Sequence, residues 1–371
     1  MPYTFLIPCL LGLEGLIAEE LREMDAQAVR AENGRVLFEG ALSMLARANL
    51  RCRYAERVQL CIGEFEARSF EALFQGTKAL PWEAWIGARD AFPVKGYSLN
   101  STLFSVSDCQ AIIKKAVVER LKPRYGLEWF EETGAVHQIQ FSIMKDRVTL
   151  VLDSSGAGLH KRGYRLDAGE APLKETLAAA LCRIARLREN HTLYDPMCGS
   201  GTILIEGAMM ARRIAPGKNR SFAAERWAQI PREIWAQERA LAAALEREAP
   251  DFHAVGADLD PAALKIARQN AERAGVARHM ALHQADLKDF RFQTERGTLI
   301  TNPPYGERLL DEAQAQALFR LMGKLFLPQR GRSYTILSPA EGFEQSFGRK
   351  ADTRRKLYNG MLKCQAYMYY K

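Results

Sequence analysis

Short apolar runs alternate with stretches of helical periodicity from Pro172 onward. The runs predict strands at Thr192–Asp195, Ala254–Asp258, Met280–Gln284, Thr298–Thr301, Tyr334–Leu337 and Leu362–Tyr370. Apolar runs of this length between turn signals are typical of buried strands, and their steady alternation with helices is typical of a parallel sheet. We therefore expect an α/β fold whose doubly wound, Rossmann-like sheet occupies this part of the chain.

The first 155 residues combine helical and strand patterns without such an alternation. Arg57–Glu66 and Arg147–Asp153 alternate as strands, whereas Asp108–Leu121 has apolar residues at helical spacing. This mixture predicts a smaller α+β module. The glycine- and base-rich connector Gly158–Arg165 (GLHKRGYR) separates the two patterns, so we expect a domain boundary close to residue 157.

The composition is that of an ordinary globular protein, with 47% hydrophobic and 26% charged residues. No apolar run approaches the ~18 residues that span a bilayer. The apolar N-terminus has neither the basic region nor the cleavage site typical of a signal peptide. We expect a cytoplasmic protein that spans no membrane.

The net charge of +8 is unevenly placed along the chain. Residues 1–160 carry 18 basic and 20 acidic side chains, and the rest of the chain carries 34 and 24. The basic excess of the second half favours a polyanionic partner. The seven cysteines form no C-x-x-C pair, and His279 and His283 fall in a strand-like alternation, so we expect no metal site.

A glycine-rich loop follows the first strand of the second half, with the sequence DPMCGSGT from Asp195 to Thr202. The order strand, Gly-x-Gly and helix is typical of a nucleotide site, because Gly199 and Gly201 let a ligand approach the backbone and the helix N-terminus offers free N–H groups. Leu204 stands where a dinucleotide loop has its third glycine, and no P-loop lysine is present, which disfavours NAD and ATP. A tight turn without a ligand remains the alternative.

Acidic residues stand at the ends of the next two strands. Asp258 is placed where dinucleotide folds hold a ribose diol, but it lies 57 residues after Gly201 because a helical insertion, Arg212–Asp251, intervenes. Asp260 precedes a proline suited to the first helical position, which predicts a helix N-cap. Asp286, after the third strand, either accepts from an adenine amine or caps a helix.

The fourth strand ends in Asn302, Pro303, Pro304 and Tyr305. Two prolines remove backbone donors and stiffen the turn. The amide oxygen of Asn302 and a rigidly held carbonyl then provide two neighbouring acceptors, and Tyr305 offers a stacking face. This set suits a planar group that bears an exocyclic NH2, and simple loop termination is the alternative.

These motifs, in this order, resemble those of class I S-adenosylmethionine (SAM) methyltransferases that act on amino nitrogens: DPMCGSGT, GADLDP, QADL and TNPPYGERL. In addition, HKRGYR, APLKETLAAAL and KLYNG resemble the THUMP-domain family of RNA guanine-N2 methyltransferases, among them enzymes of large-subunit rRNA. The resemblance covers essentially the whole chain. It implies a ferredoxin-like lead-in at residues 1–55, a THUMP RNA-binding domain at 56–157 and a methyltransferase domain at 158–371.

The resemblance also implies roles for single residues. The implied catalytic residues are Asn302, Pro303, Pro304 and Tyr305, with the Asn302 oxygen and the Pro303 carbonyl accepting from the target amine and Tyr305 stacking on a flipped base. The product of SAM is S-adenosylhomocysteine (SAH). The implied SAM residues are Thr176 for the carboxylate, Asp195 for the ammonium group, Gly199 and Gly201 for the methionine moiety, Asp258 for the ribose, and Asp286 and Leu287 for the adenine.

RNA is the implied partner, with rRNA favoured over tRNA, and no obligate protein partner is implied. Three basic residues of the connector are expected to contact phosphates beside the site, with a solvated linker as the alternative: Lys161, Arg162 and Arg165. A second basic run also favours RNA over a solvated face: Arg349, Lys350, Arg354, Arg355 and Lys356. In the insertion, Trp227 and Trp235 are expected to pack and not to stack on bases.

The Asn-Pro-Pro-Tyr tetrad alone does not separate RNA guanine-N2 enzymes from adenine-N6 enzymes or from enzymes that methylate glutamine in release factors. The connector, the helix after it and the N-terminal module favour RNA guanine. A catalytically silent RNA-binding scaffold would be expected to have a damaged loop or tetrad, and both are intact. We therefore predict a SAM-dependent guanine-N2 methyltransferase of RNA, with large-subunit rRNA as the favoured substrate and tRNA as the alternative.

Overall fold

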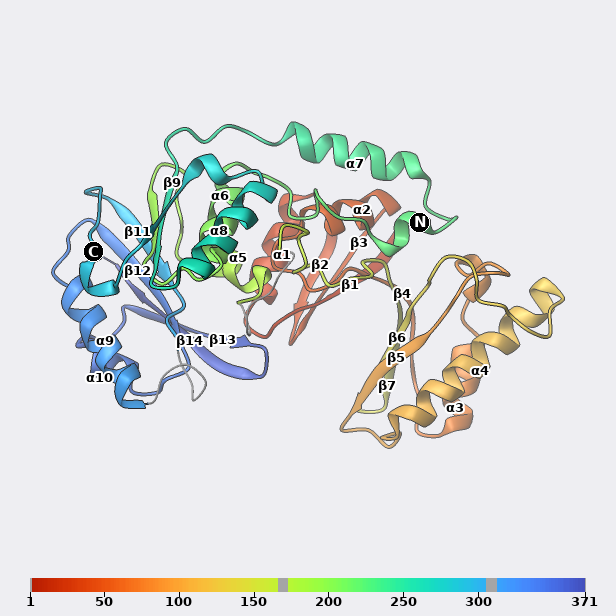
Figure 1. Ribbon diagram of the computed structural model, residues 1–371. Coiled ribbons are helices and arrows are strands. Elements are labelled where there is room, and N and C mark those ends of the chain that lie inside the picture. Colours follow the sequence, from red (N-terminus) through yellow and green to blue (C-terminus); the bar gives the residue numbers. More distant parts are fainter. Residues whose placement is uncertain (1, 166–172, 305–311, 371) are drawn as a thin grey trace. The chain divides into compact units, whose positions relative to one another are not determined.

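The computed structural model describes residues 2–165, 173–304 and 312–370 (Figure 1). The chain forms two compact units. Unit 1 consists of residues 1–9, 18–159 and 221–241, and unit 2 consists of residues 10–17, 160–220 and 242–371. None of the described helices is long and apolar enough to cross a membrane.

A seven-stranded sheet forms the centre of unit 1. Its first strand, β1 (Tyr3–Pro8), pairs along its whole length with β3 and also pairs at Phe5 and Leu6 with β4, so one sheet continues through the unit. All neighbours are antiparallel except β5 and β6. The order is β2 (Gln27–Glu32), β3 (Arg35–Gly40), β1, β4 (Gln59–Glu66), β7 (Arg147–Asp153), β6 (Ile139–Met144) and β5 (Val94–Leu99).

Helices cover one face of the half of this sheet that is formed by β4, β7, β6 and β5. In β6, Ile139, Phe141 and Ile143 are buried, as the period of two in a strand requires. The helices α3 and α4 pack against each other and against β4 and β5. The helical elements outside the insertion are α1 (Glu14–Glu23), which crosses the division between the units at residue 17, α2 (Leu42–Arg51), α3 (Phe70–Lys78), the 3-10 turn η1 (Trp82–Ala84) and α4 (Val106–Tyr125).

The insertion contributes residues 221–241 to unit 1, including η2 (Ala223–Arg226) and most of α7 (Arg232–Ala244). The Trp227 ring stacks on His137 with 4.7 Å between centroids, and its Nε1 donates to the carbonyl of Val136 at 3.0 Å. Trp227 and Trp235 are both buried, as expected from the sequence. The division by contacts therefore differs from the continuous domains at 1–55, 56–157 and 158–371, which remain a proposal.

Unit 2 is the predicted doubly wound α/β unit. The sheet has five parallel strands, and β14 then pairs antiparallel with the last of them and β13 antiparallel with β14. The order is β10 (Met280–Gln284), β9 (His253–Asp258), β8 (Thr192–Asp195), β11 (Gly297–Thr301), β12 (Arg332–Ser338), β14 (Leu362–Tyr369) and β13 (Thr353–Asn359). The helical elements are α5 (Glu175–Ile184), α6 (Thr202–Ala211), α8 (Pro261–Arg273), η3 (Ala277–His279), η4 (Leu287–Asp289), α9 (Glu312–Phe326) and α10 (Phe343–Phe347).

An aromatic cluster holds α9 and α10 against the sheet of unit 2. Phe326 stacks on Tyr334 with 5.6 Å between ring centroids, and the Tyr334 hydroxyl donates to the Phe326 carbonyl at 2.7 Å. Phe343 packs against Tyr367 at 4.5 Å. This packing leaves the carboxyl ends of the parallel strands as the edge where loops gather, which is where open α/β sheets bind ligands.

Candidate cofactor and active site

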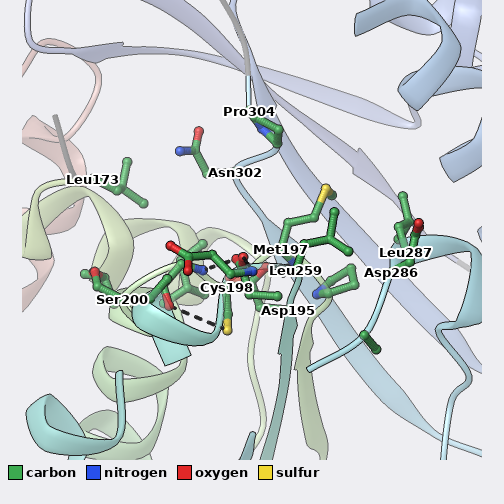
Figure 2. A pocket seen from close by; sticks show the side chains of 18 of the residues that line it. Leu173, Asp195, Met197, Cys198, Ser200, Leu259, Asp286, Leu287, Asn302 and Pro304 are labelled. Atoms are coloured by element: carbon green, nitrogen blue, oxygen red, sulfur yellow. Dashed lines mark hydrogen bonds between the residues drawn. The ribbon is translucent and has the colours of Figure 1, made fainter. Parts of the chain in front are cut away.

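A cavity of about 670 Å³ lies at the carboxyl ends of β8, β9, β10 and β11 (Figure 2). Both polar loop ends and apolar side chains line it. Of the predicted site residues, seven lie on its wall: Asp195, Gly199, Asp258, Asp286, Leu287, Asn302 and Pro304. The motifs come together because parallel strands present their carboxyl ends at one edge of the sheet.

Two glycines shape the loop after β8. Gly199 has a φ of +51°, and a Cβ there would meet no other atom within 4 Å, so this loop leaves open space at the cavity wall. Gly201 has a φ of +77°, and its Cβ would lie 3.1 Å from the Cβ of Ala267, so glycine allows α6 to begin close against α8. Gly201 does not itself line the cavity.

Asp195 is a buried carboxylate at the base of the cavity, with 2% of its surface exposed. The Thr301 hydroxyl donates to its Oδ1 at 2.8 Å, and the Met197 N–H donates at 3.3 Å. Burial raises the pKa of Asp195 to about 7, the negative charge of Asp258 adds to the rise, and the two hydrogen bonds oppose it. A cationic ligand group would bring this pKa down, because it favours the ionised form.

Asp258 is held by two backbone donors at the end of β9. Its Oδ2 accepts from Gly199 N–H at 2.8 Å and its Oδ1 from Asp260 N–H at 3.0 Å. Each carboxylate oxygen can accept more than one hydrogen bond, so the side chain is fixed in position and still able to bind a diol. Asp260 accepts from Ala262 N–H at 2.8 Å, which confirms the predicted N-cap of α8.

Asp286 serves as a cap and also faces the cavity. Its Oδ1 accepts from Lys288 N–H at 3.0 Å at the start of η4, so the capping alternative is realised. That hydrogen bond and the nearby Lys288 ammonium lower the pKa of Asp286. Because Asp286 and Leu287 both line the cavity, the cap also positions the predicted adenine contacts.

Asn302 presents an unpaired acceptor beside this cavity. Its Oδ1 is shielded from water and has no hydrogen-bond partner among the described residues. An unpaired buried acceptor costs about 1–3 kcal/mol, so such groups are rare unless a ligand completes them. Pro303 is buried behind Asn302 and Pro304 faces the cavity, whereas the predicted stacking residue Tyr305 lies outside the described residues.

Thr176, the predicted carboxylate contact, is buried within α5 and does not appear on the cavity wall. Leu173, three residues earlier, lines the cavity instead. The predicted role of Thr176 therefore has no support from its position in this structure.

The connector residues also lie differently from their expected places. Lys161 is exposed, as a phosphate contact requires. Arg162 is 2% exposed, so its guanidinium has no surface to offer a phosphate, and it pairs with Glu206 of α6. Because Arg162 is buried, the prediction that it contacts RNA phosphates is wrong.

Arg165 lies behind the wall of the cavity. Its guanidinium donates to the Thr202 hydroxyl and, at 3.4 Å, to the Leu173 carbonyl, and it lies 3.6 Å from a Glu175 oxygen. Its side chain is 10% exposed, and its Nε has no hydrogen-bond partner among the described residues. Since Thr202 and Leu173 both line the cavity, Arg165 supports the cavity wall. The sequence missed this role because a basic side chain in a glycine-rich connector is usually exposed.

A family described as RMKL-like, methyltransferase domain, matches residues 162–368, more than half of the chain. The chain belongs to this RMKL-like methyltransferase family. An RlmL ferredoxin-like domain matches residues 4–59, and a THUMP domain matches residues 67–153. These matches confirm the resemblance drawn from the motifs.

Relatives of this RMKL-like methyltransferase carry names of RNA enzymes. It is 41% identical over 370 residues to YpsC of Bacillus subtilis, named as a candidate RNA methyltransferase, and covers 96% of that protein and 99% of this chain. It is 35% identical over 374 residues to the ribosomal RNA large subunit methyltransferase K/L of Psychromonas ingrahamii, with 97% of this chain and 49% of that protein covered. The chain thus spans about half the length of its K/L relatives.

Solved structures share the whole fold of this RMKL-like methyltransferase. A Listeria monocytogenes protein, described as a predicted N6-adenine-specific DNA methylase, has a TM-score of 0.94 and 43% identity, covering 100% of this chain and 96% of that chain. The SMU.472 protein, crystallised with SAH, has a TM-score of 0.94 and 39% identity, covering 100% of this chain and 98% of that chain. Among the described residues, no cluster of His, Cys, Asp or Glu is arranged to hold a metal ion.

Proposed function

We propose that this protein transfers a methyl group from SAM to the exocyclic N2 amine of a guanine in RNA, with large-subunit rRNA as the substrate. One observation carries the proposal: Asn302, whose buried Oδ1 has no hydrogen-bond partner among the described residues, lines a methyltransferase cavity that Asp258 and Asp286 also line. An acceptor without a partner calls for a donor on the substrate, and an exocyclic NH2 is such a donor. The names of the K/L relatives support rRNA as the substrate class.

The cavity fits SAM by the chemistry of its wall. Asp258 would take the ribose hydroxyls, Asp286 the adenine amine, and the open space at Gly199 the methionine moiety. Asp195 would face the ammonium group, directly or through water. When bound, SAM supplies an electrophilic methyl group on a sulfonium. The SAH complex of the SMU.472 protein, which shares the fold at 39% identity, supports this assignment.

The chain's own residues then orient the amine. The lone pair of an arylamine is delocalised into its ring, which makes the nitrogen a weak nucleophile. Hydrogen bonds accepted by the Asn302 oxygen and the Pro303 carbonyl hold the two N–H groups, so the lone pair points at the methyl group. As the N–C bond forms, the bond between the methyl carbon and the sulfonium sulfur would break and SAH would leave. The N–H proton would become acidic and pass to water, so no strong base is required. Alignment supplies much of the rate.

Adenine N6 is the second candidate, because the Listeria monocytogenes protein is described as an adenine-specific methylase. An adenine amine offers the same two N–H donors to Asn302, so this geometry accepts either base. The THUMP domain at residues 67–153 favours an RNA substrate over DNA. Identification of the methylated nucleoside in the product distinguishes guanine from adenine as the target base.

The test is incubation of the purified chain with SAM and either rRNA or tRNA from a strain that lacks the gene. Nucleosides would then be separated by mass spectrometry. N2-methylguanosine in large-subunit rRNA is the expected product. The same nucleoside in tRNA would overturn the substrate, and N6-methyladenosine would overturn the base. No product on any RNA would overturn the proposed activity in favour of a binding scaffold or a glutamine methyltransferase.

A matched variant links the product to the site. N302A removes the unpaired acceptor and leaves the rest of the cavity wall in place. We expect turnover to be lost while the affinity for SAM, measured by calorimetry, stays at the wild-type value. A variant that loses SAM binding as well would place Asn302 in the cofactor site.

A further inference from the structure

The β13–β14 hairpin of unit 2 extends past the level of Asn302, Pro303 and Pro304, which follow β11 and are called the catalytic loop below. Thr301 pairs with Ile336 of β12, which pairs with Tyr367 of β14. Asn302 therefore lies level with Ala366, the next pair along β14. The hairpin continues from Ala366 to Leu362, four residues farther in the same direction, which is ~14 Å at ~3.4 Å per residue.

The hairpin stands close to the catalytic loop in the plane of the sheet as well. The strand order is β11, β12, β14 and β13, so β14 is two strands from the strand that carries Asn302. Two spacings amount to roughly 10 Å. A base that reaches Asn302 must leave the RNA stack, with its sugar and phosphates staying above the site. The hairpin tip lies at the height where those phosphates would pass.

The tip carries side chains suited to nucleic acid. Lys356 and Lys363 are exposed and have no acidic partner among the described residues, and the chain contains no acidic residue after Asp352. Register places Lys363 opposite Tyr358, two residues from Lys356, so the three share one face. The Lys356 ammonium lies 5.4 Å from the centre of the Tyr358 ring.

Met361 stands at the turn with 99% of its surface exposed, next to Gly360, whose φ is +63°. An apolar side chain so exposed gains nothing from the fold of the protein. The opposite face of the hairpin is anchored, because Leu357 and Cys364 are buried. One face of the hairpin tip is thus packed against the protein, and its other face and its turn present basic, aromatic and apolar side chains.

We propose that this tip, defined as Lys356, Tyr358, Met361 and Lys363, contacts the RNA that flanks the target nucleotide. The two lysines bind backbone phosphates, and Met361 packs against the base next to the one that is flipped. The proposal rests on the proposed function, since it requires an RNA substrate. It differs from the run Arg349 to Lys356 expected from the sequence, because Arg349 pairs with Asp352 and Arg354 with Glu344.

Filter binding of in vitro transcribed 23S rRNA tests the proposal, with the full chain and its K356A/K363A variant. We expect the variant to bind at least tenfold more weakly at 0.15 M salt. Its slope of log affinity against log salt should fall by about one for each lysine removed. The matched control is K324A, an exposed lysine in the last turn of α9 that carries no predicted role in RNA binding. It should bind like the wild type.

M361A tests the apolar contact separately. We expect kcat on RNA to fall severalfold while the affinity for SAM is unchanged, because the tip does not line the cofactor cavity. Wild-type RNA affinity in K356A/K363A would overturn the proposal, and so would an equal loss in K324A, which would assign binding to the overall positive charge of the chain. Tight RNA binding with adenine as the methylated base would overturn only the proposed base. No RNA binding by the wild type would overturn the RNA substrate and this inference together, and would leave a protein partner for the tip.

Discussion

Arg162 and Glu206 form an ion pair in the interior of unit 2, although 44 residues separate them in sequence. The Nε–Oε1 distance is 3.4 Å, and the side chains are 1% and 0% exposed. The Tyr164 hydroxyl donates to the same Glu206 oxygen at 3.0 Å. Burial alone would lower the pKa of Arg162, but Glu206 outweighs it and the pKa is raised. The guanidinium therefore stays charged and ties the connector to α6.

Removal of Arg162 should destabilise unit 2. R162M keeps much of the side-chain volume and leaves Glu206 buried without its cation, which typically costs about 3–5 kcal/mol. We expect a lower free energy of unfolding in calorimetry. Tryptophan fluorescence would be a poor readout here, since all five tryptophans belong to unit 1: Trp82, Trp85, Trp129, Trp227 and Trp235.

The double variant R162M/E206Q is the control for this pair. It removes both charges and retains an acceptor for the Tyr164 hydroxyl, so most of the lost stability should return. Stability equal to wild type in R162M, together with weaker RNA binding, would contradict the structural role and restore the phosphate contact expected from the sequence.

Arg165 should act on SAM affinity. Its guanidinium joins Thr202 and Leu173, two residues of the cavity wall. R165M removes charge-assisted hydrogen bonds worth about 1.5–3 kcal/mol, so we expect SAM binding in calorimetry to weaken by about tenfold or more. R165K should recover part of the loss.

The pair Arg165 and Thr202 can be tested for dependence on each other. T202V removes the acceptor, and R165M/T202V should be no weaker in SAM binding than R165M alone, because the two residues act through one contact. Additive losses would mean that Arg165 acts elsewhere. If R165M left SAM affinity unchanged and raised the KM for RNA, Arg165 would be an RNA contact, as the sequence predicted.

The pKa of about 7 at Asp195 predicts pH-dependent SAM binding. Ionised Asp195 is the form that attracts a cationic ligand, and its fraction rises about tenfold between pH 6 and pH 8, so SAM affinity should rise by the same factor. D195N should bind more weakly and lose this part of the dependence, leaving only the titration of SAM itself. An identical pH profile in wild type and D195N would contradict the assignment.

Asp195 also makes the stability of the protein depend on pH. Stability should fall as the pH rises, whereas SAM affinity should rise. The folded pKa lies above the ordinary value of about 3.9, so the folded state holds a proton that the unfolded state has released between about pH 4 and pH 7. The free energy of unfolding should therefore fall as the pH rises through this window. In D195N this decline should be absent, which calorimetry across the window would measure.

The sequence predicted the site best where strand topology alone decides position. Asp195 and Asp258 end two strands of one parallel sheet, and Asp286 and Asn302 come just after two others. Their meeting at one edge therefore needs no tertiary detail. Asp260 was predicted equally well, because capping depends on local sequence.

Positions that depend on long-range packing could not be predicted. Arg162 and Arg165 look solvent-exposed in a glycine-rich connector, and only the fold brings Glu206 to Arg162. The strand β13 was missed because its sequence, TRRKLYN, contains three consecutive basic residues and lacks apolar alternation. Charged side chains are common on edge strands, where they discourage pairing with other chains.

Residues 221–241 of the insertion are held in unit 1 by a long-range contact that local sequence patterns do not predict. Arg47 of α2 donates to both carboxylate oxygens of Glu238 in α7, from Nε at 2.9 Å and Nη2 at 2.8 Å, across 191 residues. It also donates to the Met24 carbonyl at 3.0 Å. The hydrogen bond with Glu238 raises the pKa of Arg47, and Glu238 is only 3% exposed.

Loss of this pair should release α7 before the rest of unit 1 unfolds. R47K keeps the charge but cannot form the two-pronged contact, so we expect a loss of roughly 1–3 kcal/mol, concentrated in the insertion. Hydrogen exchange should become faster in residues 232–241 while β4 and β7 keep their protection. E238Q should give the same pattern more mildly, since one acceptor remains. Uniform loss of protection across the unit would mean that the insertion and the sheet unfold as one, and that Arg47 stabilises the whole of unit 1.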